Sequence, residues 1–290
     1  MIELLYGVWF MKGGMYAMAQ AMGRLFLEQG GELRTSTPVE RIVVENGCAC
    51  GVEAGGTVHY ADYVVCDADF PYAITQLVDE ADARGKYTPH KVEDMEYSCS
   101  CFILYLGLDK RYPSDAVHSI RFASDFERNI DDIFDDARFP RTTRRFTATR
   151  LRRWTARLRP RLFDAVRAGA GAAAVARIAP LDGRGSGRVP RPGARPHGAR
   201  DGVRGRAATI SCSSAPTRAR FAERFNAYDG ATFGLRPTLG QSNYWRPHNK
   251  ATDCNRLYFC GSSVHPGAGV PIVLLSAKLA AEELMRDDRL

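Results

Sequence analysis

The run RLYFCGSSVHPGAGVPIVLLSAKLAAEE, at Arg256–Glu283, decides the fold of this chain. Its apolar start, Leu257–Gly261, predicts a short buried strand that ends in glycine. A glycine-rich turn follows. Apolar residues at helical spacing then predict a helix that begins near Pro271 and continues over Val273–Arg286. A strand, a glycine turn and a helix in this order are typical of an α/β protein.

The turn between this strand and helix has features of a cofactor-binding loop. Gly267 and Gly269 lack Cβ atoms, so the main chain could approach a flat ligand closely. The first N–H groups of the helix would point outward near Pro271, where the helix dipole favours negative charge. A reduced flavin accumulates negative charge at its N1/C2 edge and needs such donors. A glycine-rich turn without a ligand is the alternative interpretation of the same spacing.

Upstream of this run, the sequence predicts more α/β structure. Apolar residues at helical spacing predict a helix over Met15–Gln29 with one buried face. Glu32–Ser36 is expected to be a short strand. Asn46-Gly47 is a hairpin signal between strands at Val39–Glu45 and Cys48–Ala54. Further strands are expected at Thr57–Tyr60, Tyr63–Cys66 and Cys101–Leu108.

Cysteine usage and hydropathy exclude several classes of protein. The eight cysteines include no CxxC pair, which zinc sites usually contain, so we expect no metal site. Reduced cysteines acting as small apolar strand residues are the simpler interpretation. The sequence has no run of about 18 apolar residues, so we expect no membrane-spanning helix. The first residues also lack the features of a signal peptide, and we therefore expect a cytoplasmic protein.

Charge divides the chain, whose net charge is +7, into two unlike parts. In Arg138–Arg220, 21 arginines against three acidic residues, without any lysine, give a net charge of +18. In the rest of the chain, 19 basic against 30 acidic residues give −11. The basic segment is also rich in Ala, Gly and Pro and has no lasting period of 2 or 3.6 residues. It is therefore unlike the protein on either side of it.

Three interpretations of this basic segment remain open. Its Gly183–Arg206 tract has the composition of a disordered segment. It could instead be a tail that binds nucleic acid or acidic lipid. We favour a shift of the reading frame, because GC-rich coding DNA read out of frame yields Arg, Ala, Gly and Pro in excess. In a shifted frame, the codons allowed for Arg141–Thr147 include Asp-Asp-Pro-Ser-Phe-Tyr.

Four segments of the chain closely resemble the bacterial phytoene desaturase family of FAD-dependent carotenoid oxidoreductases. They are Gly7–Tyr16 (GVWFMKGGMY), Val39–Ala68, Arg224–Asn249 and Arg256–Glu283. The resemblance covers about residues 1–137 and 221–288. It implies an α/β, FAD/NAD(P)-binding Rossmann-like flavoprotein fold with a mixed-sheet substrate domain. Residues 1–69 would be part of the FAD-binding domain, residues 70–235 the substrate domain, with 138–209 interpreted as frame-shifted or disordered, and residues 236–290 a return to the FAD-binding domain.

The resemblance also implies a cofactor site, with FAD as the cofactor. The residues that it places there are Gly261, Ser262, Gly267, Gly269, Val270, Pro271, Ile272 and Val39. Gly261 and Ser262 would lie near the ribityl chain and the pyrophosphate. The backbone at Val270–Ile272 would face the flavin ring. Ser262 would make a weaker contact than the acidic residue that many related flavoproteins have there. Val39 would meet the adenine through its backbone, or would be a plain core residue of a strand.

The reaction that the resemblance implies is dehydrogenation of phytoene or a similar long apolar polyene. Such a substrate offers no acid or base handle, so we expect no catalytic triad and assign no catalytic residue. His265, the titratable residue of the glycine turn, could assist proton removal or make a structural hydrogen bond. We expect peripheral contact with a membrane, where the substrate dissolves, and no nucleic-acid partner. Another carotenoid or retinoid oxidoreductase and a non-catalytic basic nucleic-acid-binding protein are the alternatives.

One departure from the family pattern is large. A dinucleotide-binding fold needs an early strand, a GxGxxG turn and a helix, and no GxGxxG opens this chain. Gly169-Ala170-Gly171 lies in the basic segment and lacks a preceding apolar strand. The chain begins midway through the family pattern, so its N-terminal dinucleotide-binding unit is expected to be missing. We therefore expect this polypeptide alone to bind FAD weakly or not at all and to have impaired activity.

Overall fold

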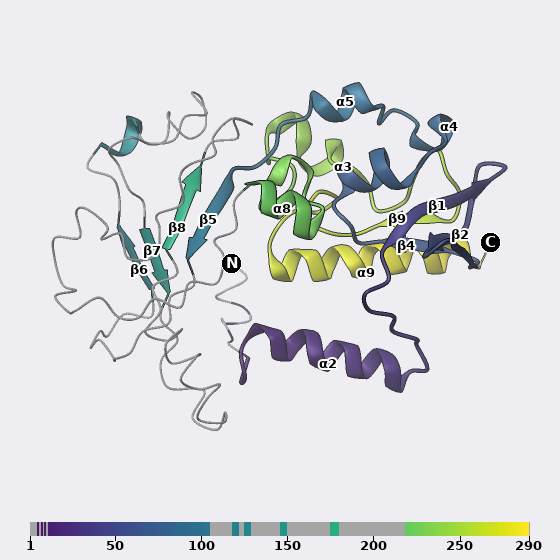
Figure 1. Ribbon diagram of the computed structural model, residues 1–290, viewed down its shortest axis with the longest axis horizontal. Coiled ribbons are helices and arrows are strands. Elements are labelled where there is room, and N and C mark those ends of the chain that lie inside the picture. The colour runs from purple at the N-terminus through teal and green to yellow at the C-terminus, as the bar shows by residue number, and fades with distance from the viewer. Residues whose placement is uncertain are drawn as a thin grey trace.

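The computed structural model describes residues 5, 7, 9, 11–104, 118–121, 125–128, 146–149, 175–179 and 218–289 of the 290-residue chain. Its helices and strands form a mixed α/β fold with small sheets (Figure 1). In chain order they are α2 (Met15–Glu28), β1 (Val39–Glu45), β2 (Cys48–Ala54), β3 (Thr57–Tyr60), β4 (Val64–Cys66), α3 (Phe70–Tyr72), η1 (Ala73–Leu77), α4 (Ala81–Arg84), α5 (Pro89–Glu93), β5 (Ser100–Leu104), β6 (His118–Arg121), β7 (Phe146–Thr149), β8 (Val175–Ala179), α8 (Arg218–Phe225), η2 (Tyr228–Gly230), η3 (Leu239–Gln241), η4 (Asn243–Trp245), β9 (Leu257–Phe259) and α9 (Val270–Asp287).

The predicted hairpin forms and begins a three-stranded antiparallel sheet of β1, β2 and β3. Glu45 pairs with Cys48 across a two-residue turn, in which Asn46 and Gly47 have φ angles of 51° and 74°. Positive φ at both turn residues matches the right-handed twist of the two strands, which is why Asn-Gly closes hairpins of this length. The strands Val39–Glu45, Cys48–Ala54 and Thr57–Tyr60 are therefore confirmed.

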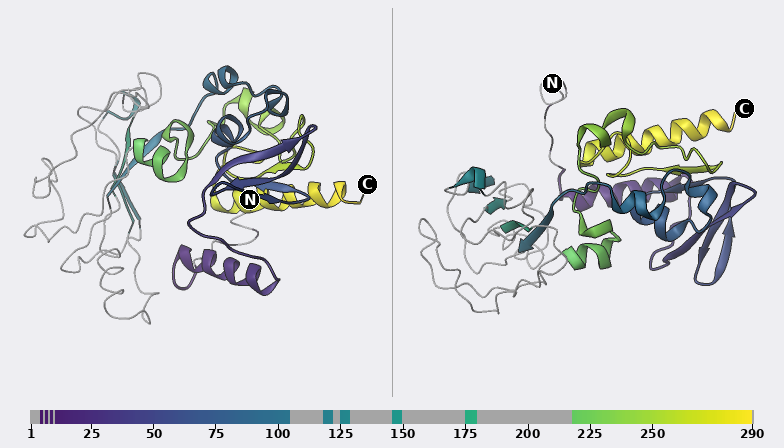
Figure 2. Two further views of the ribbon diagram at one scale, coloured as in Figure 1. Left: turned by 45° about the vertical axis from the view of Figure 1, so that its right-hand side comes forward. Right: turned by 90° about the horizontal axis from the view of Figure 1, so that it is seen from above.

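A parallel pair of strands joins two distant parts of the sequence. Val65 of β4 lies opposite Tyr258 of β9, and Cys260 N donates to Cys66 O at 3.0 Å just beyond the pair. Helix α9 runs alongside the β4–β9 pair in both views (Figures 1 and 2). Its far end is tied down because Tyr258 OH and Lys250 Nζ both donate to Asp287, the latter at 2.8 Å. The predicted strand and helix at the C-terminal end are confirmed, with the helix beginning at Val270.

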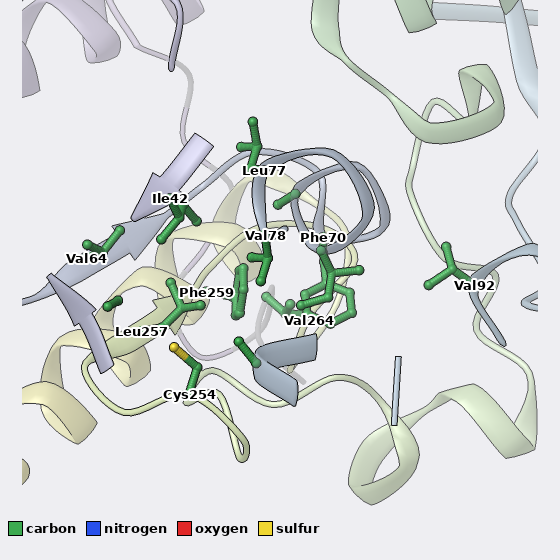
Figure 3. Close-up of a cluster of buried hydrophobic side chains, with 14 residues drawn as sticks. Ile42, Val64, Phe70, Leu77, Val78, Val92, Cys254, Leu257, Phe259 and Val264 are labelled. Atoms are coloured by element: carbon green, nitrogen blue, oxygen red, sulfur yellow. The ribbon is translucent and has the colours of Figure 1, made fainter. Parts of the chain in front are cut away.

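The buried core draws on the same two parts of the sequence (Figure 3). Its members are Ile42, Ala49, Val64, Phe70, Ala73, Ile74, Leu77, Val78, Ala83, Val92, Cys254, Leu257, Phe259 and Val264. The Phe259 ring stands edge-on to that of Phe70, with centroids 5.0 Å apart. Phe259 and Val264 flank the first half of the glycine turn, so both ends of this half are anchored in the core. The division of the chain at residues 69 and 235 stays a prediction.

Some sequence expectations differ from the structure. Helix α2 forms as predicted, but none of its residues is buried, and its ribbon lies apart from the other described elements (Figure 1). Residues 32–36 form no strand, since their backbone pairs with no other strand in the described part of the chain. Strand β5 covers Ser100–Leu104, and the rest of that predicted strand lies outside the described residues. In the basic segment the described residues between 138 and 209 form β7 and β8, and Gly183–Arg206 lies outside them.

The cysteines with described side chains are free thiols: Cys48, Cys50, Cys66, Cys99, Cys254 and Cys260. Burial raises the pKa of Cys66 and of Cys254 to about 11. Both thiols are therefore neutral at pH 7, as suits small apolar residues packed in and beside strands. Over the described ranges, no helix combines the length and the apolar character that crossing a membrane requires.

Candidate functional site

The candidate site is the turn at Gly261–Pro271, which connects strand β9 to helix α9. Gly267 and Gly269 have φ angles of 144° and 115°, which side chains rarely permit. A Cβ atom at either glycine would meet no protein atom closer than 3.7 Å. Backbone conformation, rather than packing against the protein, therefore requires glycine here. Gly269 is exposed, whereas Gly267 is buried against the Arg246 guanidinium.

Arg246 holds the first half of the turn from the protein side. Its guanidinium is almost fully buried, with 3% of the residue exposed. It donates to four carbonyl oxygens: Ser262 O at 2.5 Å, Val264 O at 3.0 Å, Gln241 O at 3.2 Å and Leu235 O at 3.3 Å. Desolvation lowers the pKa of Arg246, and the nearby Asp69 carboxylate opposes that shift. This one side chain therefore ties the turn to two other loops.

Asn249 and Ser276 hold the middle of the turn in the same way. Asn249 Nδ2 lies 3.0 Å from Phe259 O and 3.1 Å from His265 O. Ser276 Oγ donates to His265 O at 2.7 Å and accepts from Gly261 N at 3.2 Å. Because Ser276 belongs to α9, these bonds fix the distance between the strand end and the helix. The carbonyl groups of Ser262, Val264 and His265 are thus occupied by donors of the protein.

The N–H groups in the second half of the turn have no such partners. Among the described residues, no acceptor lies within hydrogen-bonding range of the amides at Gly267–Val270. Gly269 caps α9 without a side-chain hydrogen bond, and the first helical turn holds no acidic residue. Ala268–Pro271 are exposed. Free donors at a helix N-terminus favour an electron-rich acceptor, which is the chemistry expected for the edge of a flavin ring.

A cavity of about 210 Å³ lies beside the beginning of the turn. Asp69, Thr232, Gly234, Ser262 and Phe225 are among its lining residues. It opens at the carboxyl ends of β4 and β9, the edge where parallel sheets usually bind ligands. Thr232 Oγ1 is buried there without a hydrogen-bond partner in the described part of the chain. Desolvation raises the pKa of the Asp69 carboxyl, although hydrogen bonds from Ser263 and the Tyr228 amide oppose the shift.

His265 stands at the centre of the turn, where the sequence left two roles open. Its backbone N–H donates to Pro247 O at 2.8 Å, and its carbonyl accepts from Asn249 and Ser276. Its ring Nδ1 is buried and makes no hydrogen bond to any described residue. The structural hydrogen bond that we considered is therefore not made by this atom.

Seven of the eight predicted site residues lie in one continuous segment, Gly261–Ile272, which comprises the turn and the first residues of α9. Val39 stands apart: it begins β1, pairs with Ala54 and is 39% exposed. Sequence reasoning missed the residues that hold the turn, namely Asp69, Arg246, Asn249 and Ser276. The first three lie inside or directly beside the quoted segments at Val39–Ala68 and Arg224–Asn249. Only the position of these residues near a quoted segment could have suggested them.

A substitution at Gly234 should disturb the turn from the cavity side. An added Cβ would lie 2.2 Å from Ser263 Oγ, and Gly234 has a φ of 67°. We expect Gly234→Ala to lower the free energy of unfolding by about 1–3 kcal/mol through strain and displaced packing. Gly240→Ala is the matched control, because its Cβ would meet nothing within 4 Å and its φ is not positive. Urea unfolding followed by circular dichroism measures both. Equal losses in the two variants would contradict the close contact.

The matching family and the related sequences agree on the class of the chain. The family described as flavin-containing amine oxidoreductases matches residues 4–96 and 215–285. The chain is 34% identical to the 4,4'-diapophytoene desaturases (4,4'-diaponeurosporene-forming) of Staphylococcus aureus strain MRSA252 and of Staphylococcus haemolyticus. Each alignment covers 99% of this chain and 58% of the relative, so the chain spans under two thirds of their length. A crystal structure of an oxidoreductase from Methanosarcina mazei matches 95% of this chain and 55% of its own, at 15% identity and a TM-score of 0.43.

Proposed function

Because this chain belongs to the family of flavin-containing amine oxidoreductases, we propose that it carries the flavin-contacting turn of an FAD-dependent carotenoid desaturase. The observation that carries the proposal is the two-sided turn at Gly261–Pro271. The carbonyl groups of Ser262, Val264 and His265 are bound by protein donors, and the amides at Gly267–Val270 make no hydrogen bond among the described residues. A main chain held in this way presents donors to a ligand at a fixed position.

The residues of the turn suit a flavin on three counts. The amides at Gly267–Val270 would donate to the electron-rich edge of the ring, where the dipole of α9 adds favourable charge. The absence of a Cβ atom at the exposed Gly269 leaves room for that edge. Gly261 and Ser262 lie at the carboxyl end of β9, where the ribityl chain and the pyrophosphate would be held. We retain Val39 as a possible backbone contact to the adenine.

The proposed reaction is oxidation of an apolar polyene of the phytoene type. Bound FAD would supply the two-electron acceptor when a saturated C–C bond loses a hydride and a proton. Two relatives named as 4,4'-diapophytoene desaturases make that polyene the first substrate to test. In this proposal the chain holds the acceptor through the Gly261–Pro271 turn. Peripheral membrane contact belongs to the same proposal, because such a substrate dissolves in lipid.

Flavin binding by the full chain tests the first half of this proposal. We expect saturable quenching of flavin fluorescence with a dissociation constant weaker than about 1 µM, because the 290 residues contain no GxGxxG motif, the usual pyrophosphate cradle. FMN and riboflavin serve as comparison ligands. Quenching that stays linear with protein concentration for all three flavins would contradict a flavin site in this chain.

Product analysis tests the second half. The full chain is expressed in two hosts, one accumulating 4,4'-diapophytoene and the other phytoene, and extracted carotenoids are separated by chromatography. A longer conjugated chain, seen as a red-shifted absorption spectrum, is the expected product of desaturation. An isomerised, oxygenated or saturated product would instead favour another oxidoreductase of the same superfamily. Binding to nucleic acid that falls steeply with salt would favour the basic binding protein.

A further inference from the structure

Asp69 occupies an unusual place at the edge of the candidate site. It follows β4 by three residues, and its carboxylate accepts hydrogen bonds from two segments far along the chain. Oδ2 accepts from Tyr228 N at 2.8 Å, and Oδ1 accepts from Ser263 Oγ. One carboxylate therefore connects the end of a strand, the loop at 228–235 and the glycine turn.

Ser263 links the Asp69 carboxylate to the turn through its side-chain hydroxyl. Only 1% of this residue is exposed, and its Oγ accepts from Leu235 N at 3.3 Å while donating to Asp69. The residues on either side of it, Ser262 and Val264, have their carbonyl groups bound by Arg246. The beginning of the turn is thus held from one side by a guanidinium and from the other by a carboxylate. Hydrogen bonds to a charged group are shorter and stronger than neutral ones.

We propose that Asp69 is a positioning residue of the flavin site, which sets where the Gly261–Pro271 turn lies by means of Ser263 and the Tyr228 amide. The role of the turn in binding a flavin rests on the function proposed above. Asp69 is also among the residues that line the cavity beside the turn, together with Ser262 and Ser263.

The raised pKa of the Asp69 carboxyl helps to distinguish a positioning role from a role in fold stability. Its pKa in the folded protein is raised, with desolvation as the largest cause. A carboxyl with a raised folded pKa contributes stability at low pH and loses that contribution as pH rises through this pKa. Ionisation of the buried carboxyl therefore carries a cost in fold stability. Asparagine has nearly the same shape and no charge, so it should relieve this cost while weakening the bonds to Ser263 and Tyr228.

The test compares Asp69→Asn with Asp67→Asn in the full chain. Asp67 lines the same cavity two residues earlier, is exposed and makes no side-chain hydrogen bond among the described residues, so it is a matched control. Hydrogen exchange followed by mass spectrometry reports on peptides that cover residues 261–270. We expect Asp69→Asn to speed exchange in these peptides about tenfold at pH 7, with a urea midpoint equal to or above that of the wild type. Asp67→Asn should change neither quantity.

Ser263→Ala provides a second, independent variant. It removes the same hydrogen bond from the other partner, so it should speed exchange in the turn to a similar degree. The double variant should then exchange little faster than either single variant, because both act on one interaction. Additive effects would show that Asp69 and Ser263 act separately and would overturn the proposed route.

Flavin binding distinguishes failure of this inference from failure of the proposed function. If the wild type binds riboflavin or FAD, Asp69→Asn should weaken that binding about tenfold. Unchanged exchange and unchanged binding in Asp69→Asn would overturn the inference and leave the function standing. A wild type that binds no flavin, together with faster exchange in Asp69→Asn, would keep the positioning role and remove the flavin. A drop in the urea midpoint without a selective change in the turn would reduce Asp69 to a structural residue.

Discussion

Replacing Arg246 by alanine is expected to lower the free energy of unfolding by about 3–4 kcal/mol, among the larger effects that a single substitution produces. The side chain donates to four carbonyl groups, at Leu235, Gln241, Ser262 and Val264, and is almost fully buried. Removing it leaves these acceptors without their donor and leaves a cavity behind. The lowered pKa of Arg246 shows that burying the guanidinium has a cost of its own, which the variant regains in part. The expected loss of stability is the cost of the unpaired carbonyl groups and of the cavity, less the desolvation cost that the variant regains.

Two further variants keep this prediction testable if Arg246→Ala fails to fold. Arg246→Lys keeps the charge but offers three donors from a single nitrogen, which cannot span four carbonyl groups, so an intermediate loss is expected. Arg34→Ala removes an equal charge from an exposed pair with Glu32 and should cost less than about 1 kcal/mol. Urea unfolding followed by circular dichroism gives all three values. A loss in Arg246→Lys no larger than that in Arg34→Ala would show that Arg246 does not hold the turn.

Phe259→Ala should have an effect of similar size, about 3–5 kcal/mol, for a different reason. Phe259 is 1% exposed and packs edge-on against Phe70, whose ring in turn stands 4.8 Å from that of Tyr87. Truncation removes apolar contacts and leaves a void at the junction of β9 with the segment that follows β4. The surrounding strands cannot close this void, because Leu257 and Val264 are themselves packed in the same core.

Phe233→Ala is the matched control for that truncation, since its residue is 50% exposed. Its loss should stay below about 1 kcal/mol. Guanidinium unfolding monitored by circular dichroism compares the two variants, and Phe259→Leu should fall between them. If Phe259→Ala and Phe233→Ala lose equal stability, the cluster in Figure 3 is not the core that supports the turn.

Local sequence patterns determined most of the regular structure around the site. Asn46-Gly47 specified its hairpin because a two-residue turn of this kind needs positive φ at both positions, and Asn and Gly adopt positive φ more readily than other residues. Pro271 and the apolar spacing after it specified α9, because proline suits the first helical turn and the spacing aligns one face. The glycine turn itself was predicted from Gly267 and Gly269. In each case the decisive interaction joins residues only a few positions apart.

Tertiary structure decided what local patterns could not. The helix over Met15–Glu28 has apolar spacing, yet spacing cannot say whether a partner lies against it, and the described structure buries none of its residues. The anchors of the turn were also invisible: Asp69 reaches Ser263 across 194 positions and the Tyr228 amide across 159. Whether a polar side chain holds the turn depends on which groups the folded chain brings within about 3 Å of it. The sequence alone thus determined that a glycine turn joins β9 to α9. Only the fold decided which side chains hold that turn, because a hydrogen bond depends on the distance between two atoms in space and not on their separation along the chain.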